Sequence, residues 1–240
     1  LSIARLPASG ISSTARAMAR LSLLDWLAVA HAGTGQPASR IIRELVAEEG
    51  GRPVSTVIGS RLKAPPRAAA LANGTTSHAL DYDDTHFAHV GHLSVAIMPA
   101  ALAAAEDVDA PISAVVDAFL LGAEAACRLG MALGRGHYEK GFHQTATSGA
   151  FGAAIAAGRI YGLNEDQLRV ALSLVSTRAS GLKSQFGTMG KPLNAGIAAA
   201  NGVEAALLAR RGFSSCDDGV SGRQGFIATH GEGSPDPSAW

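Results

Sequence analysis

Titratable side chains are concentrated in one short stretch of the chain, HALDYDDTHFAHVGHLS, at residues 78–94. Only 17% of the 240 residues are charged, and the whole chain contains eight histidines. Three kinds of site are compatible with this stretch: a metal site, an acid/base site and a solvated helix end. The residues concerned are His78, His86, His89 and His92, together with Asp81, Asp83 and Asp84.

A metal site would have to use histidines that follow each other at intervals of three. On a continuous helix, His86, His89 and His92 would rise ~9 Å from first to last. One zinc ion with ligand bonds of ~2.1 Å cannot reach all three unless Gly91 breaks the helix. The sequence contains no HExxH motif and no closely spaced cysteine pair. We therefore expect no bound metal.

An acid/base site fits the spacing of the carboxylates better. Asp81, Asp84 and Thr85 lie three and four residues apart, so a helix would present them on one face, with Asp83 pointing elsewhere. Carboxylates close to imidazoles form coupled titrating groups that can transfer protons near neutral pH. The alternative of a solvated helix end with capping aspartates stays open from this stretch alone.

Two single residues elsewhere are further candidates. His143 comes just before a helix of small residues, where a lone histidine is more often structural. Lys191 lies between Gly190 and Pro192 at a predicted junction between a loop and a helix. A helix N-terminus beside a lysine favours carboxylate or phosphate binding, although a solvated lysine is the commoner situation.

Composition excludes several classes of protein. The net charge is +0 and the pI is about 7.3, so there is no basic excess for nucleic acid or an acidic membrane. Cys127 and Cys216 make no disulfide framework, and Cys127 is expected in the core. We expect a cytoplasmic protein, because no signal peptide and no uncharged apolar run of ~18 residues is visible.

Helix signals dominate and predict an all-α fold with tight packing of small residues. The exception is one short strand at 55–60, and Asn164 with Gln167 predicts a capping box. From about Ser214 the chain is rich in Gly, Ser, Pro and Asp, so we expect a helical domain over 1–213 and a linker or flexible tail over 214–240. Helices are expected over 12–33, 39–51, 64–74, 93–107, 111–134, 147–163, 164–182 and 194–212.

Four stretches, taken in order, resemble the MmgE/PrpD family. They are HALDYDDTH, GHLSVAIMPAALAAAE, GFHQTATSGAFGAAIAAGRIYGLNEDQ and GKPLNAG…GVEAALLARRGF. The family includes 2-methylcitrate dehydratase, cis-aconitate decarboxylase and iminodisuccinate epimerase. The resemblance implies a large helical domain and a smaller α+β lid domain, which would lie beyond Trp240 and is absent from this chain. It also implies cofactor-free chemistry and a homodimer, which we expect to be held by the apolar helices between Leu93 and Gly134.

The resemblance also implies which residues form the site. Asp81, His92, His143 and Lys191 would be catalytic, and Thr85 and Lys191 would bind substrate. The implied reaction is 2-methylcitrate dehydratase-like, in which water is eliminated from a small di- or tricarboxylate after a proton next to a carboxylate is removed. His92 and His143 are candidates for base and acid in either order, and Asp81 would orient a histidine. A decarboxylase, an epimerase and a lidless binding or dimerisation module are the alternatives.

Three positions depart from the family pattern beside these residues. Leu93 follows His92 where the family usually has proline, and Gln144 follows His143 where it often has proline. Asn194 replaces a common histidine after Lys-Pro-Leu. The titrating residues stay in place, but the substrate is left open.

Overall fold

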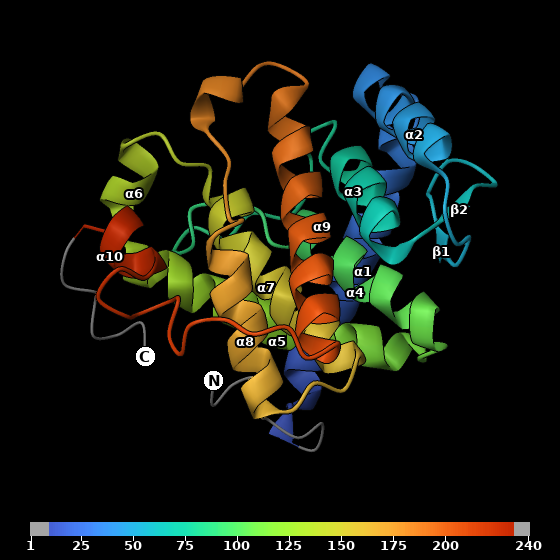
Figure 1. Ribbon diagram of the computed structural model, residues 1–240. Coiled ribbons are helices and arrows are strands. Elements are labelled where there is room, and N and C mark those ends of the chain that lie inside the picture. Colours follow the sequence, from blue (N-terminus) through green and yellow to red (C-terminus); the bar gives the residue numbers. More distant parts are fainter. Residues whose placement is uncertain (1–9, 233–240) are drawn as a thin grey trace.

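The computed structural model describes residues 10–232, and within that range it is a helical assembly with one small sheet (Figure 1). The predicted all-α class is confirmed. The helices are α1 (Ser13–Gly33), α2 (Pro37–Glu49), α3 (Pro66–Ser77), α4 (Ser94–Val108), α5 (Ile112–Leu133), α6 (Arg135–Glu139), α7 (Gln144–Ile160), α8 (Glu165–Ser176), α9 (Gly190–Arg210) and α10 (Phe226–His230). The sheet pairs β1 (Ser55–Thr56) with β2 (Lys63–Ala64) antiparallel, and η3 (Lys183–Gln185) is a 3-10 helix.

Local side chains set helix ends where the sequence predicts them. The Oγ of Ser12 accepts a hydrogen bond of 3.1 Å from the backbone N–H of Ala15 at the start of α1. At α8, the Asn164 side chain accepts from the N–H of Gln167, and the Gln167 side chain accepts from the N–H of Asn164. This is the predicted capping box, and it satisfies N–H groups that the first turn leaves unpaired.

The predicted strand at 55–60 is shorter than expected. Only Ser55–Thr56 is extended and paired, and its partner strand is Lys63–Ala64. Gly59, with a φ of 81°, lies in the turn that brings the chain back to that partner. The hairpin therefore occupies the place of a longer single strand.

The helix predicted over 164–182 ends early, at Ser176. The residues that follow, 177–189, form a loop containing η3 that leads into α9. Gly181 in this loop has a φ of 140°, a conformation that residues with a Cβ rarely adopt. The helical periodicity therefore continues in the sequence beyond the point where the backbone leaves the helix.

Helix α7 is the centre of the molecule and packs against α4, α5, α8 and α9. Every residue from Gln144 to Gly158 is buried. Where α7 meets α5, a Cβ added to Gly122 would lie 2.5 Å from the carbonyl oxygen of Gly152, so only glycine allows this close crossing. The predicted tight packing of small residues is confirmed.

The helices that we expected to hold a homodimer are largely internal. Helix α4 is enclosed, with Val95–Ala101 all buried. Exposed large hydrophobic side chains on α4 and α5 are Val108 and Ile112, whereas α1 and α2 carry more of them, at Met18, Leu21, Leu24, Leu27, Ile41 and Leu45. The homodimer stays a prediction, and α1 offers a better surface for it than α4. None of the helices between residues 10 and 232 is long and apolar enough to cross a membrane.

The segment expected to be a linker or tail packs back onto the helices as far as Glu232. Phe226 and Ile227 of α10 are buried, and the Phe226 ring lies 4.9 Å from that of Phe151 in α7. Helices α6 and α10 lie together at one end of the molecule, opposite α2 and the sheet (Figure 1). The domain boundary at residue 213 stays a prediction, and residues 233–240 lie outside the described residues.

Candidate functional site

The stretch rich in histidine and aspartate forms an irregular loop between α3 and α4. Residues 78–93 contain no helix, so the prediction of one helical face carrying Asp81, Asp84 and Thr85 is wrong. Asp81 has a left-handed φ of 59°, which ends any helical continuation. Aspartate accepts this conformation more readily than most residues.

Asp84 closes the loop by capping the next helix. Its carboxylate accepts hydrogen bonds from the backbone N–H of Ser94 at 3.1 Å and from the Ser94 hydroxyl at 2.5 Å. Burial raises the pKa of Asp84, although the bonds from Ser94 oppose this. Its carboxylate is therefore committed to the start of α4, as in the capping alternative that the sequence left open.

Asp83, which we expected to point away, is at the centre of the site. Its side chain is fully buried, with Oδ1 2.9 Å from Nδ1 of His78 and Oδ2 2.9 Å from Nδ1 of His92. Burial alone would favour the neutral acid, but the hydrogen bonds to His78 and His92 outweigh it and hold the pKa of Asp83 well below its usual range. Asp83 is thus a fixed anion that orients two imidazole rings.

His92 is the histidine whose charge is favoured. Burial would lower its pKa, but the hydrogen bond to Asp83 and the charges of Asp83 and Asp81 raise the pKa above the usual 6.5. Its Nε2 lies 3.5 Å from Oδ1 of Asp81, and the side chain is 17% exposed. Because Nδ1 is held by Asp83, Nε2 is the nitrogen that can exchange a proton with a ligand.

Lys191 enters the site from the first turn of α9. Its Nζ donates a hydrogen bond of 2.5 Å to Oδ2 of Asp81 and lies 4.9 Å from the centre of the Phe186 ring. His78, Asp81 and Lys191 together line a cavity of 340 Å³ whose other walls come from the start of α2 and from residues 187–192. Lys191 and the N-terminus of α9, which the sequence predicted to lie together, therefore form part of the wall of a cavity.

His143 completes the cluster from the residue just before α7. Its ring stacks on His78 with 5.8 Å between centres, and the ring of Phe186 meets it edge-on at 4.9 Å. His143 is buried, which lowers its pKa to about 3. The structure therefore brings together Asp81, His92, His143 and Lys191, four of the five residues that the sequence singled out.

Thr85 is the fifth, and it is not part of this cluster. It is exposed, and none of the interactions between described residues connects it to the other four. Its role in substrate binding stays a prediction.

The three histidines considered for a metal do not converge. His86 is exposed, while His89 is buried and its Nε2 lies 2.6 Å from the hydroxyl of Ser148. A different set, His78, Asp81, Asp83 and His92, offers ligand atoms within 4.8 Å of one another. Hydrogen bonds and the Lys191 ammonium already occupy these atoms, so the donors fit a proton-transfer site without an ion. The absence of a metal stays a prediction.

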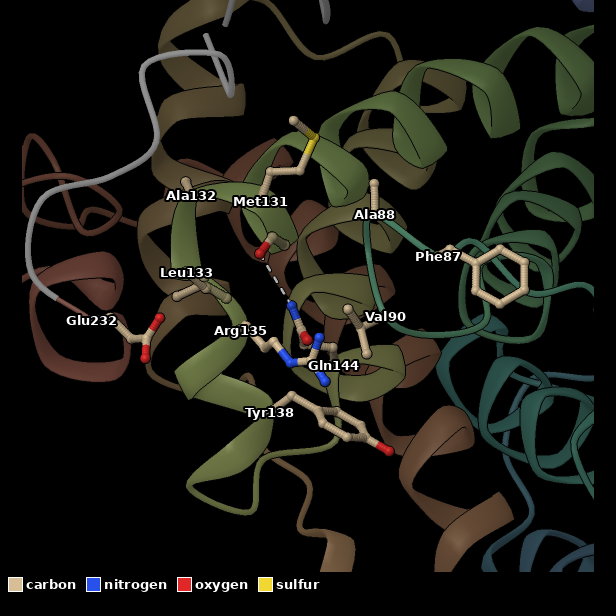
Figure 2. Close-up of a pocket in the computed structure, with 12 residues that line it drawn as sticks. Phe87, Ala88, Val90, Met131, Ala132, Leu133, Arg135, Tyr138, Gln144 and Glu232 are labelled. Carbon is tan, nitrogen blue, oxygen red and sulfur yellow. Dashed lines mark hydrogen bonds between the residues drawn. The ribbon is translucent and has the colours of Figure 1, made fainter.

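A larger cavity, of 730 Å³, has a different lining (Figure 2). Its wall includes Arg135, Tyr138 and Glu232, and none of the predicted site residues lines it. Gln144, the neighbour of His143, reaches it and donates a hydrogen bond of 3.1 Å to the carbonyl oxygen of Gly130. The paired carboxylates and imidazoles needed for acid/base chemistry belong to the cluster whose His78 and Asp81 line the smaller cavity.

His78, Asp83, Phe186 and Asn194 contribute to the cluster but were not among the predicted site residues. His78 follows Gly74 by four residues and so continues the buried face of α3, which is a signal the sequence contains. Helical spacing points Asp83 away from Asp81 and Asp84, so the sequence does not predict its central position in the site. Phe186 comes from the loop that replaces the end of the predicted helix over 164–182.

Comparison with known proteins identifies the family. The sequence pattern of the MmgE/PrpD N-terminal domain matches residues 2–238. This chain belongs to the MmgE/PrpD family. It is 33% identical over 217 residues to a cis-aconitate decarboxylase of Aspergillus terreus and 32% identical over 219 residues to the human cis-aconitate decarboxylase. A cis-aconitate decarboxylase-like protein of Aspergillus oryzae is 31% identical over 221 residues.

These alignments cover most of this chain but less than half of each relative. They include 88% of this chain with the Aspergillus terreus protein and 89% with the human one, against 44% and 45% of those proteins. The chain therefore spans less than half the length of these relatives, and it matches the pattern of the family's N-terminal domain. The activity of the full-length relatives is assigned to this chain only as a proposal.

Proposed function

We propose that this chain provides the helical part of a lyase active site that decarboxylates a small unsaturated tricarboxylate of the cis-aconitate kind, without a cofactor. The observation that carries the proposal is the cluster of Lys191, Asp81 and His92, in which Lys191 and Asp81 line a cavity and His92 contacts Asp81 and buried Asp83. The names of the relatives favour decarboxylation over the other reactions of the family.

Substrate binding would use the Lys191 ammonium. It is held at the cavity wall by Asp81, whose side chain is 51% exposed and can turn toward solvent. A substrate carboxylate can replace Asp81 as the partner of Lys191, and the N-terminus of α9 adds a favourable dipole. The site thus exchanges an internal ion pair for one with the substrate.

Decarboxylation then needs a proton donor. The bond between one carboxylate and its carbon breaks, and carbon dioxide leaves. The bonding electrons move into the conjugated skeleton, where a remaining carboxylate shares the charge. One proton must be delivered to carbon to complete the product. His92 suits this role because its pKa is raised and Asp83 stabilises the imidazolium.

Elimination of water from 2-methylcitrate would use the same groups in other roles. A neutral His92 would remove the carbon-bound proton, and a second group would protonate the leaving hydroxide. The raised pKa of His92 makes its protonated form more available than that of an ordinary histidine, which favours proton delivery.

The test is an assay of the chain with cis-aconitate and, separately, with 2-methylcitrate, with and without a chelator. We expect release of carbon dioxide from cis-aconitate that chelation does not change, and its loss on His92→Gln. Loss of water from 2-methylcitrate without any release of carbon dioxide would make the protein a dehydratase. Binding of both acids without turnover would make this part of the protein a binding module and overturn the proposal.

A further inference from the structure

The side chain of Asn194, beside the ring of His143, indicates which ring nitrogen of His143 carries the proton. Nδ2 of Asn194, in α9, lies 3.3 Å from Nδ1 of His143 and 3.4 Å from the carbonyl oxygen of Leu182. The amide group of asparagine can donate only through its nitrogen and accept only through its oxygen. Its orientation therefore decides which form of His143 it can bind.

The carbonyl of Leu182 settles that orientation. A carbonyl oxygen only accepts hydrogen bonds, so Nδ2 of Asn194 must face it. The reversed amide would place two acceptor oxygens against each other with no hydrogen between them. Since the same Nδ2 faces Nδ1 of His143, that nitrogen must present its lone pair.

The backbone around Leu182 holds this carbonyl in place. The N–H of His143 donates to the carbonyl oxygen of Gly181 at 3.0 Å, and the N–H of Lys183 donates to that of Gly141 at 2.8 Å. A Cβ on Gly181 would lie 2.7 Å from the Cβ of Ala146 and 3.4 Å from Cγ of Asn194. Glycine at this position thus lets the loop approach both His143 and Asn194.

We propose that Asn194 is a positioning residue that fixes His143 in the tautomer with its proton on Nε2, so that His143 acts as a neutral hydrogen-bond donor to the substrate and not as the base. The role toward a substrate rests on the proposed function. Nε2 of His143 has no partner among the described residues and is not among the polar atoms that the fold seals off. Burial keeps the ring neutral, since it lowers the pKa to about 3.

In this assignment His92 and His143 have different roles. His92 carries the exchangeable proton because Asp83 supports its charge, whereas an amide beside His143 supports no charge. Nε2–H of His143 is then suited to hold a substrate carboxylate or the charge that develops on it.

The test reads the tautomer directly by two-dimensional ¹H–¹⁵N NMR of the imidazole nitrogens in ¹⁵N-histidine-labelled chain at neutral pH. His143→Gln identifies the His143 signals. We expect Nδ1 at the shift of an unprotonated nitrogen and Nε2 at that of a protonated one. In Asn194→Asp, a carboxylate acceptor replaces the amide donor, so Nδ1 of His143 should become protonated, whether or not Nε2 keeps its proton.

A matched control is Asn201→Asp on the same helix. The Asn201 amide bonds Arg178 and not a histidine, so this variant should leave the His143 signals unchanged. A proton on Nδ1 in the unaltered chain, or the same tautomer in Asn194→Asp, would overturn the proposal. The NMR result does not depend on turnover, so failure of the proposed reaction would be seen separately, in the assay with cis-aconitate. If turnover is found, Asn194→Asp should lower kcat at least tenfold with a smaller change in KM.

Discussion

Two groups of histidines flank the first turns of α7, and they are used in different ways. His78 and His92 share the buried carboxylate of Asp83 beside a cavity. His89 and His137 are as completely buried as His78 and more so than His92, but their partners are neutral. Nε2 of His137 lies 2.9 Å from the hydroxyl of Thr147, and its Nδ1 lies 2.9 Å from the carbonyl oxygen of His230.

The difference shows that the partner, and not burial, decides what a histidine can do. Burial lowers the pKa of His89 to about 3 and that of His137 to about 4, because hydroxyl and carbonyl groups do not support an imidazolium. His92 has its pKa raised because two carboxylates lie within reach. A histidine beside a carboxylate is thus the candidate proton carrier, and His89 and His137 are packing residues with hydrogen bonds.

The largest expected effect is on turnover in His92→Gln. Glutamine can still hydrogen-bond to Asp83 but cannot carry a proton, so the rate of product formation should fall ~10²–10⁴-fold. The measurement is kcat with cis-aconitate, beside a melting curve that shows the fold intact. His31→Gln, at an exposed position, is the matched control. Turnover within tenfold of the unaltered chain would remove His92 from the chemistry.

His137→Gln should have the opposite effect, lowering the stability of the fold without changing turnover. Glutamine cannot reach both Thr147 and the carbonyl of His230, so one buried partner is left unsatisfied at a cost of ~1–3 kcal/mol. The free energy of unfolding, from urea titration, should fall by this amount, while turnover per folded molecule stays the same. A loss of turnover in a folded variant would show that the second group of histidines also serves the reaction.

The pH dependence of stability should also separate the groups. His89 and His137 are neutral in the fold with pKa values of about 3 and 4, but take up a proton near pH 6.5 when unfolded. The unfolded chain binds more protons between these values, so stability should fall as the pH falls from 6.5 toward 4, by ~1.4 kcal/mol per pH unit for each such histidine. His92 acts in the other direction, since its stabilisation is lost as the pH rises through its raised pKa.

Urea titrations at several pH values measure this slope. His137→Gln should make it shallower by about one proton, and His92→Gln should not. An unchanged slope in His137→Gln would contradict the assignment of a neutral, structural histidine there.

The smallest expected effect belongs to Asp84→Asn. Asparagine keeps an oxygen that can cap Ser94 but lacks the charge, so the free energy of unfolding should fall by about 1 kcal/mol or less. Turnover should not change, because Asp84 serves α4 and not the cavity. A tenfold loss of turnover at unchanged stability would place Asp84 in the site.

The sequence predicted what local rules determine. Caps such as Ser12 and Asn164, and the small residues at the α5–α7 crossing, correctly indicated helices and their close packing. The resemblance of ordered motifs located Asp81, His92, His143 and Lys191, which the fold does bring together.

The geometry inside the site could not be predicted, because it depends on contacts between distant segments. Asp83 becomes central only because the loop over 78–93 leaves the helix and returns His92 to it. The partner of His143 lies 51 residues away in α9, and Leu182 orients it from a loop whose sequence still has helical periodicity. Helical spacing rules apply only within one element, so they misplaced these residues.

The most direct test of the whole account is the affinity of the chain for cis-aconitate, measured by calorimetry, in Lys191→Met and in a matched control. Methionine keeps an apolar stem of similar length but loses the charge that pairs with Asp81. Lys183→Met makes the same change in η3, where the ammonium bonds the carbonyl oxygen of Tyr138 instead. We predict that Lys191→Met weakens binding at least tenfold and that Lys183→Met leaves it within twofold of the unaltered chain. Equal affinity in the unaltered chain and in Lys191→Met would contradict the claim that this cluster is a carboxylate-binding active site.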